Sequence, residues 1–273
     1  MSHESSPKRR FPWYDSAWLA CFVRAKAFIA SRHPSEVAGF VEAMQPLRTD
    51  PAFHTKHLGS LLEGELLGRI RKVIAALNPA DLELHEIKSF GRWVVHDHPI
   101  LAELQDAMTR IVSDVVGEPV ASSYNFLSLY TRLGKCPVHM DAPFAKWTLD
   151  ICIDQSDPWP IHFSQVMPWP EEANLPGESW ESQILGDASN RFESFTLEPG
   201  EAVVFSGSSQ WHYRDSLPSA KQNAFCHLMF FHFVPAGVAA YIDPKCWEGY
   251  FDIPGLGEVI GDPSRTTLRE WSL

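Results

Sequence analysis

The sequence lacks the features that mark membrane, secreted and nucleic-acid-binding proteins. No apolar run approaches the roughly 18 residues that a membrane-spanning helix needs. Residues 1–10 are polar and lack the apolar stretch of a secretory signal. Positive charge is scarce, because 34 Asp and Glu outweigh 23 Lys and Arg, and the formal net charge of −11 repels a phosphate backbone. We therefore expect a soluble, cytoplasmic protein that binds neither membranes nor nucleic acid.

Cysteine is also sparse, and its spacing excludes two kinds of covalent support. The five cysteines are odd in number, widely scattered and free of any C-x-x-C pair. This pattern indicates neither a disulfide framework nor a structural zinc site. We expect each cysteine to be a small buried hydrophobic residue. They are Cys21, Cys136, Cys152, Cys226 and Cys246.

The first part of the chain, from about residue 12 to residue 118, has the apolar periodicity of helices. Apolar residues recur at three- and four-residue steps from Trp18 to Ile29. Pro99 stands where the first turn of another helix accepts a proline. The same patterns predict helices at 35–44 and from about 60 to 74, and a short strand at 91–96.

After Gly117 the pattern changes to short β-type runs separated by Pro, Gly, Asp and Ser. About seven such strands in one stretch favour a β-sandwich or barrel over a parallel α/β sheet. The loop from Pro168 to Asn190 is rich in Pro, Trp and Glu, and we regard it as a candidate lid. The expected strands are 124–133, 147–154, 160–165, 192–197, 202–205, 210–213 and 225–234.

The first chemical motif is His139-Met140-Asp141. In an extended chain, residues two apart point to the same side, so the imidazole and the carboxylate converge while Met140 faces away. An imidazole and a carboxylate are two-thirds of the 2-His-1-carboxylate triad that binds non-haem iron(II). By itself the H-x-D pattern is weakly specific, and a pair in a surface turn is the competing interpretation.

A second motif supplies the third ligand. Pro199-Gly200 makes a tight turn, a strand follows, Gly207 permits another bend, and His212 opens the next strand. A facial site on a β-barrel requires such a ligand from a distant strand. We expect His139, Asp141 and His212 to hold one metal ion, with three positions left open for substrate and dioxygen.

With these motifs the chain resembles the iron(II)- and 2-oxoglutarate-dependent dioxygenases. The shared features are the H-x-D pair, the Pro-Gly approach to a strand, the distal histidine and an apolar closing strand at 225–234. The resemblance implies an α+β fold with a double-stranded β-helix core of the jelly-roll or cupin-like kind. It divides one integrated domain into a mainly helical support region (1–118), a catalytic core (119–237) and a C-terminal extension (238–273).

The resemblance also implies the chemistry. Such enzymes use iron(II), dioxygen and 2-oxoglutarate, release succinate and CO2, and most often hydroxylate an unactivated C–H bond. Relatives that halogenate lack the carboxylate that Asp141 supplies here, so its presence favours hydroxylation. The expected primary substrate is a small molecule or a peptide.

The residue that binds the distal carboxylate of 2-oxoglutarate is less well defined, because no Arg lies at the spacing usual in the family. Arg214, two residues beyond His212, should face the same interior and would need a carboxylate partner there. We rank Arg214 slightly ahead of Lys221, which lies in a polar turn, and His227 is a third candidate. Tyr130 is placed to donate its hydroxyl to the co-substrate, with core packing as the alternative.

Other histidines and other functions remain to be weighed. His162 and His232 lie in apolar strands and should be satisfied core residues, whereas His96 and His98 have no third ligand nearby. Two further classes of function stay open: a cupin-type metal oxygenase or isomerase that does not use 2-oxoglutarate, and a catalytically silent binding module. The tail 241–273 either covers the barrel or forms a dimer contact.

Overall fold

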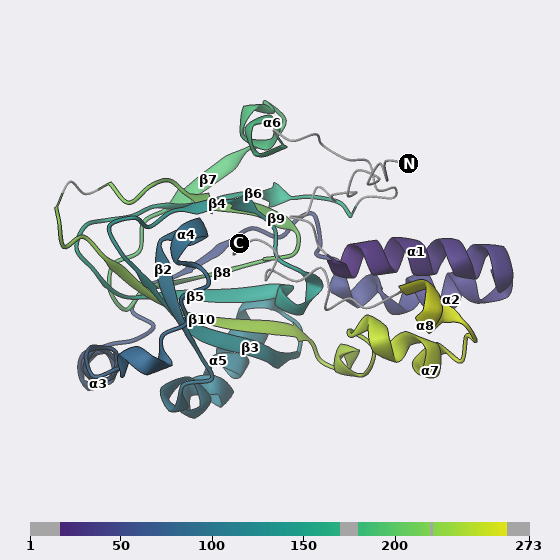
Figure 1. Cartoon of the computed structure of the whole chain (residues 1–273), viewed down its shortest axis with the longest axis horizontal. Coiled ribbons are helices and arrows are strands. Elements are labelled where there is room, and N and C mark those ends of the chain that lie inside the picture. The colour runs from purple at the N-terminus through teal and green to yellow at the C-terminus, as the bar shows by residue number, and fades with distance from the viewer. Residues whose placement is uncertain (1–16, 170–179, 219–220, 261–273) are drawn as a thin grey trace, which may run out of the picture.

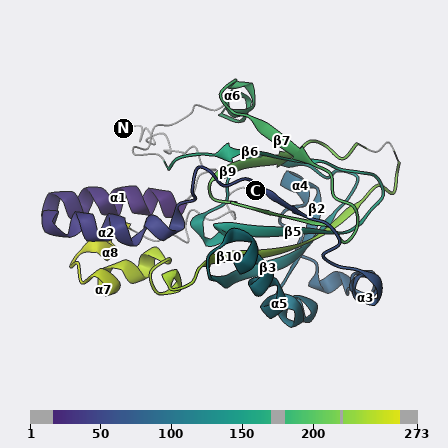
Figure 2. The same cartoon turned by 180° about the vertical axis from the view of Figure 1, so that it is seen from behind.

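The structure is a computed structural model, and it describes residues 17–169, 180–218 and 221–260. Within these ranges the chain combines helices with two antiparallel β-sheets (Figure 1). The sheets lie one above the other, with two helices under the larger sheet and a group of helices at one end (Figures 1 and 2). Among the described residues, no helix is both long enough and apolar enough to cross a membrane.

The larger sheet has six strands and is centred on one long strand near the end of the chain. Its order is β1 (Lys56–Leu58), β8 (Ala202–Phe205), β5 (Trp147–Gln155), β10 (Cys226–Pro235), β3 (Val120–Tyr130) and β2 (Arg92–His96). The central strand β10 pairs antiparallel with both β3 and β5. The edge strands β1 and β2 both come from the first part of the chain.

The smaller sheet has four strands and carries the predicted metal ligands. Its order is β4 (Cys136–His139), β9 (Gln210–Arg214), β6 (Ile161–Val166) and β7 (Phe192–Phe195). From β3 to β10 the chain passes repeatedly from one sheet to the other, and only β6 and β7 follow each other within one sheet. These crossings bring strands that are distant in sequence onto facing surfaces.

The larger sheet has two differently packed faces. Along β8, Val203 and Phe205 point inward and pack with residues of the smaller sheet, whereas Ala202 and Val204 point outward. The outer face is covered by α3 (Gly64–Ala75) and α5 (Pro99–Val116). The helix α5 begins at a proline, as predicted, and its first turn is capped by the side chain of His98, whose Nδ1 accepts the amide hydrogen of Ile100.

A third cluster of side chains joins the two ends of the chain. It contains α1 (Ala17–Arg32) and α2 (Val37–Ala43) from the start, and α7 (Trp247–Phe251) and α8 (Leu256–Ile260) from the end. Trp18 and Trp247 meet edge to face at 5.5 Å, and Met140 and Trp211 of the smaller sheet's ligand-bearing segments pack into the same cluster. The described part of the tail therefore covers one end of this chain.

The structure confirms the four predicted helices and the seven predicted strands as elements, with ends shifted by a few residues. The sequence analysis missed β1, whose three residues carry too little pattern to be recognised. The expectation for Cys246 was wrong, because this residue is exposed while the other four cysteines are buried. Of the candidate lid, residues 170–179 lie outside the described residues, and α6 (Trp180–Gly186) follows them; the remaining helix is α4 (Ile87–Phe90).

Candidate metal centre

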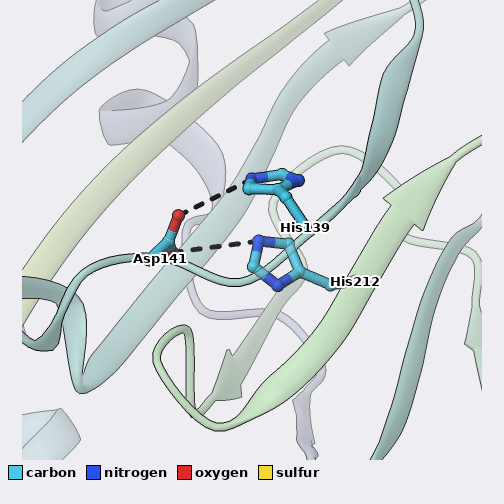
Figure 3. A group of neighbouring side chains, drawn as sticks. All are labelled: His139, Asp141 and His212. Atoms are coloured by element: carbon cyan, nitrogen blue, oxygen red, sulfur yellow. Dashed lines mark ion pairs between the residues drawn. The ribbon is translucent and has the colours of Figure 1, made fainter. Parts of the chain in front are cut away.

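The smaller sheet places His139, Asp141 and His212 around one point (Figure 3). His139 ends β4, and the antiparallel register sets it directly opposite His212 of β9, with ring centroids 4.2 Å apart. Asp141 follows two residues after His139, while the intervening Met140 points into the helical cluster. One nitrogen of each imidazole and one carboxylate oxygen all lie within 4.8 Å of one another. No other group of this kind occurs in the part of the chain that the structure describes.

Both imidazoles are oriented by their second nitrogen. The Nδ1 atom of His139 is 2.7 Å from the carbonyl oxygen of Pro137, and Nδ1 of His212 is 3.0 Å from that of Gln210. These contacts assign the proton to Nδ1 and leave the lone pair on Nε2. The two Nε2 atoms face the carboxylate of Asp141, at 3.6 Å from Oδ1 and 3.8 Å from Oδ2. This arrangement presents three lone-pair donors to a common centre.

The position of Asp141 depends on a close approach to Gly207, in the turn between β8 and β9. The amide of Asp141 donates to the carbonyl oxygen of Gly207 at 2.8 Å. A Cβ atom on Gly207 would collide with the Asp141 carboxylate, and would come within 2.6 Å of the Ala145 carbonyl oxygen and 2.8 Å of Thr148 Oγ1. Glycine is therefore required here by space rather than by backbone conformation.

Burial dominates the electrostatics of the three ligands. It lowers the pKa of His212 well below its usual value, and the neighbouring His139 adds to this effect. It also raises the pKa of Asp141, although His139 and Arg92 oppose the shift. The pKa of His139 is lowered by burial, but Cys136 and Asp141 outweigh that loss and bring it to about 9. A divalent cation would compensate the buried carboxylate, and two neutral imidazoles with one carboxylate suit iron(II).

The first-ranked anchor, Arg214, does face the interior, but it already has a carboxylate partner. Its Nη2 atom donates to Asp150 Oδ2 at 2.9 Å, and Nη1 donates to the carbonyl oxygen of Trp159. The exposed fractions of the two charged side chains are 3% and 0%. This pair explains how a guanidinium can be buried beside the site, and it leaves Arg214 committed to Asp150.

The other predicted anchors lie away from the interior. Lys221 is largely exposed and donates to Asp157 at 2.8 Å. His227 lies opposite Leu129 on the outward-facing side of β10. Tyr130 is buried in the interior core, as predicted for either of its two roles, and its hydroxyl accepts a hydrogen bond from Arg92 at 2.9 Å.

The sequence analysis did not single out Arg92, Glu86 or Asp150, all of which are buried near the site. An inward position of Arg92 follows from the alternation Arg92, Val94, His96 along β2, but its partners come from segments that no local pattern connects. His232 was expected to be a satisfied core residue. It is buried and stacks on Tyr124 at 3.9 Å, yet its Nδ1 atom has no hydrogen-bond partner among the described residues.

Comparison with known proteins gives structural similarity without sequence similarity. No family model and no curated protein sequence matches the chain. Similar solved structures include an oxidoreductase of the 2OG-Fe(II) oxygenase family from Burkholderia pseudomallei, with 14% identity over 66% of this chain and 84% of that one, and a TM-score of 0.45. They also include AviO1 from Streptomyces viridochromogenes Tue57, with 16% identity, coverage of 72% and 95%, and a TM-score of 0.49.

A third similar structure is HygX from Streptomyces hygroscopicus with nickel and 2-oxoglutarate bound, with 12% identity, coverage of 67% and 83%, and a TM-score of 0.48. Identities this low carry no residue roles from one protein to another. The functional proposal therefore depends on the site itself.

Proposed function

We propose that this protein is an iron(II)- and 2-oxoglutarate-dependent oxygenase that hydroxylates an unactivated C–H bond of a small molecule or peptide. The observation that carries the proposal is the triad of His139, Asp141 and His212. Both histidines present Nε2 to the carboxylate, and both are held in that orientation through Nδ1. A pair of histidines in a surface turn would have no reason to be oriented in this way.

The strand order supports a double-stranded β-helix core. Four strands of the larger sheet run β8–β5–β10–β3, and the smaller sheet runs β4–β9–β6–β7. Each sheet thus interleaves strands from the beginning and the end of the β-rich region, as two interlocked Greek keys do. In such a fold, ligands from two strands of one sheet point into the space between the sheets.

The residues of the site have separable tasks in this proposal. His139, Asp141 and His212 would hold the metal on one face, leaving the opposite positions for co-substrate and dioxygen. Iron(II) bound there supplies dioxygen activation coupled to the conversion of 2-oxoglutarate to succinate and CO2. Side-chain exposures of 14% for His139 and 21% for Asp141 leave a route for ligands, while His212 at 5% is sealed behind them.

The proposal is tested by anaerobic titration of iron(II) and 2-oxoglutarate into metal-free protein. We expect a weak visible charge-transfer band that requires both additions and is absent from His212→Ala. A matched control is His162→Ala, because His162 lies on the same sheet but bonds Ser194 and faces away from the triad. Admission of dioxygen should then yield one succinate per 2-oxoglutarate consumed.

Two outcomes would contradict the proposal in different ways. Iron binding without a band or succinate would favour a cupin-type oxygenase or isomerase that does not use 2-oxoglutarate. Failure of the wild-type protein to bind iron would favour a silent binding module.

A further inference from the structure

One arginine inside the sandwich has donors that no described residue uses. Arg92, on the inner face of β2, gives its Nε hydrogen to Glu86. Its Nη1 atom donates to Ser128 Oγ at 3.2 Å and to Tyr130 Oη at 2.9 Å. Its Nη2 atom forms no hydrogen bond with any described residue, so one side of the guanidinium fork remains available.

The two hydroxyls beside Arg92 add to this surplus of donors. Ser128 Oγ and Tyr130 Oη both act as acceptors from Nη1, which leaves their own hydrogens to be donated elsewhere. No described residue accepts either hydrogen. Burial raises the pKa of Tyr130 above its usual value, so this hydroxyl keeps its proton at neutral pH. Three donor groups therefore converge where the protein supplies no acceptor for them.

The guanidinium is also held rigidly. The rings of Phe90, Phe126 and Tyr130 lie 4.7, 5.3 and 5.3 Å from its central carbon. Aromatic faces fix the plane of the fork, and Glu86 fixes its Nε edge. A donor set that is fixed before a ligand arrives loses little entropy on binding a carboxylate.

No other cation considered for this role competes for it. Arg214 is sealed against Asp150, and Lys221 is exposed and paired with Asp157. The inward-facing residues of β10 provide no positive side chain: they are Cys226, Leu228, Phe230 and a histidine, His232. Burial lowers the pKa of His232 to about 3, so this imidazole is neutral.

Arg92 lies near the metal ligands at a distance that suits a short dicarboxylate. The ring of Phe90 contacts both sides, at 4.7 Å from the Arg92 guanidinium carbon and 6.2 Å from the ring of His139. A five-carbon dicarboxylic acid spans about 5 Å between its terminal carbons, because it contains four C–C bonds of ~1.5 Å. One end can therefore reach the metal while the other meets Arg92.

We propose that Arg92, Ser128 and Tyr130 form the subsite for the distal carboxylate of the 2-oxo acid co-substrate, in place of Arg214 and Lys221. This inference rests on the proposed function, since it assumes that the 2-oxo acid end binds the metal. Glu86 acts as a positioning residue that holds the Nε edge, so that the Nη edge faces the ligand.

The test compares two ligands that differ only at the distal end. Nickel(II)-loaded protein is titrated by calorimetry with 2-oxoglutarate and with 2-oxopentanoate, which has a methyl group instead of the distal carboxylate. The wild-type protein should bind 2-oxoglutarate about 10- to 100-fold more tightly, the range expected for charge-assisted hydrogen bonds. In Arg92→Gln the two ligands should bind with nearly equal affinity.

A second variant and a matched control guard this result. Glu86→Gln combined with Arg92→Gln removes both charges of the pair, so it tests the same point without leaving a buried carboxylate unpaired. Lys221→Gln removes a rival cation and should keep the wild-type preference. One nickel ion per chain in each variant verifies that the site is folded.

The outcomes separate the inference from the function on which it rests. If Arg92→Gln and the double variant keep the preference for 2-oxoglutarate, or if wild type shows no preference, the subsite is assigned wrongly while 2-oxo acid binding stands. If the nickel-loaded wild type binds neither acid, the proposed function itself is contradicted.

Discussion

The two faces of the larger sheet use the same strands in opposite ways. Along β10, Met229, Phe231 and Phe233 point outward into a wholly apolar layer with α3 and α5. Their neighbours Phe230 and His232 point inward, where Arg92 and Asp150 also lie. The outer face stabilises the fold by burying apolar area. The inner face carries buried polar groups that are costly unless each finds a partner.

The polar groups of the inner face divide again by how they are partnered. Arg214 and Asp150 neutralise each other within the protein. Arg92 and the triad instead retain donors or lone pairs that are directed at one region. The comparison teaches that buried charge alone does not mark a ligand site. The informative feature is hydrogen-bonding capacity that the protein leaves unused.

The largest expected effect concerns stability on the outer face. Phe231→Ala should lower the free energy of unfolding by about 3–5 kcal/mol, because it opens a cavity at a fully buried position. Iron(II) affinity of the folded protein should stay unchanged. Chemical denaturation and metal titration measure the two quantities. Loss of metal binding without loss of stability would break the division between the faces.

An effect of similar size is expected for the sealed ion pair. Arg214→Met leaves the carboxylate of Asp150 buried without its partner, which should cost about 3–5 kcal/mol of unfolding free energy. Adding Asp150→Leu should recover most of that loss, because two apolar side chains replace two charges. Denaturation of both variants checks this. A double variant no more stable than the single one would argue that the pair does more than balance charge.

Gly207→Ala should act on the metal without breaking the fold. The added methyl group displaces the Asp141 carboxylate, so iron(II) affinity should fall about 100-fold, the upper end for losing support around a metal ligand. Gly68→Ala is the control, since a Cβ at that glycine meets nothing within 4 Å. Equal iron(II) affinities in the two variants would show that Asp141 is not positioned as described.

The smallest effect is expected at Glu86. Glu86→Gln keeps an oxygen acceptor for Arg92 but removes a negative charge beside the proposed carboxylate subsite. The affinity for 2-oxoglutarate should rise by about two- to fivefold, as expected for a single partly screened charge. Calorimetry on nickel(II)-loaded protein measures it. A weaker affinity would indicate that Glu86 contributes more through orientation than it costs through repulsion.

The sequence predicted those features that depend on local periodicity. The two-residue alternation in β4 and its continuation predicts that His139 and Asp141 converge, and the apolar spacing predicts α1 and α5. The strand Ala202–Phe205 was predicted with its observed bounds because turn residues flank a short apolar run. These patterns are contained within a few residues, so no knowledge of pairing is needed.

Features that depend on strand pairing could not be predicted in this way. Arg214 was expected to require a carboxylate, but its partner Asp150 is 64 positions away and is chosen by the sheet arrangement. Arg92 meets Ser128 and Tyr130 because β2 joins β3 in a particular register. The edge strand β1 exists because β8 offers it hydrogen-bonding groups, rather than because of its own three residues.

The most direct test of the central claim is an anaerobic crystal structure with iron(II) and 2-oxoglutarate. We predict iron at roughly 2.0–2.2 Å from Nε2 of His139, Nε2 of His212 and one carboxylate oxygen of Asp141, as for other metal–imidazole and metal–carboxylate bonds. The distal carboxylate should meet Arg92, Ser128 and Tyr130. Iron bound elsewhere, or bound without these three ligands, would contradict the account.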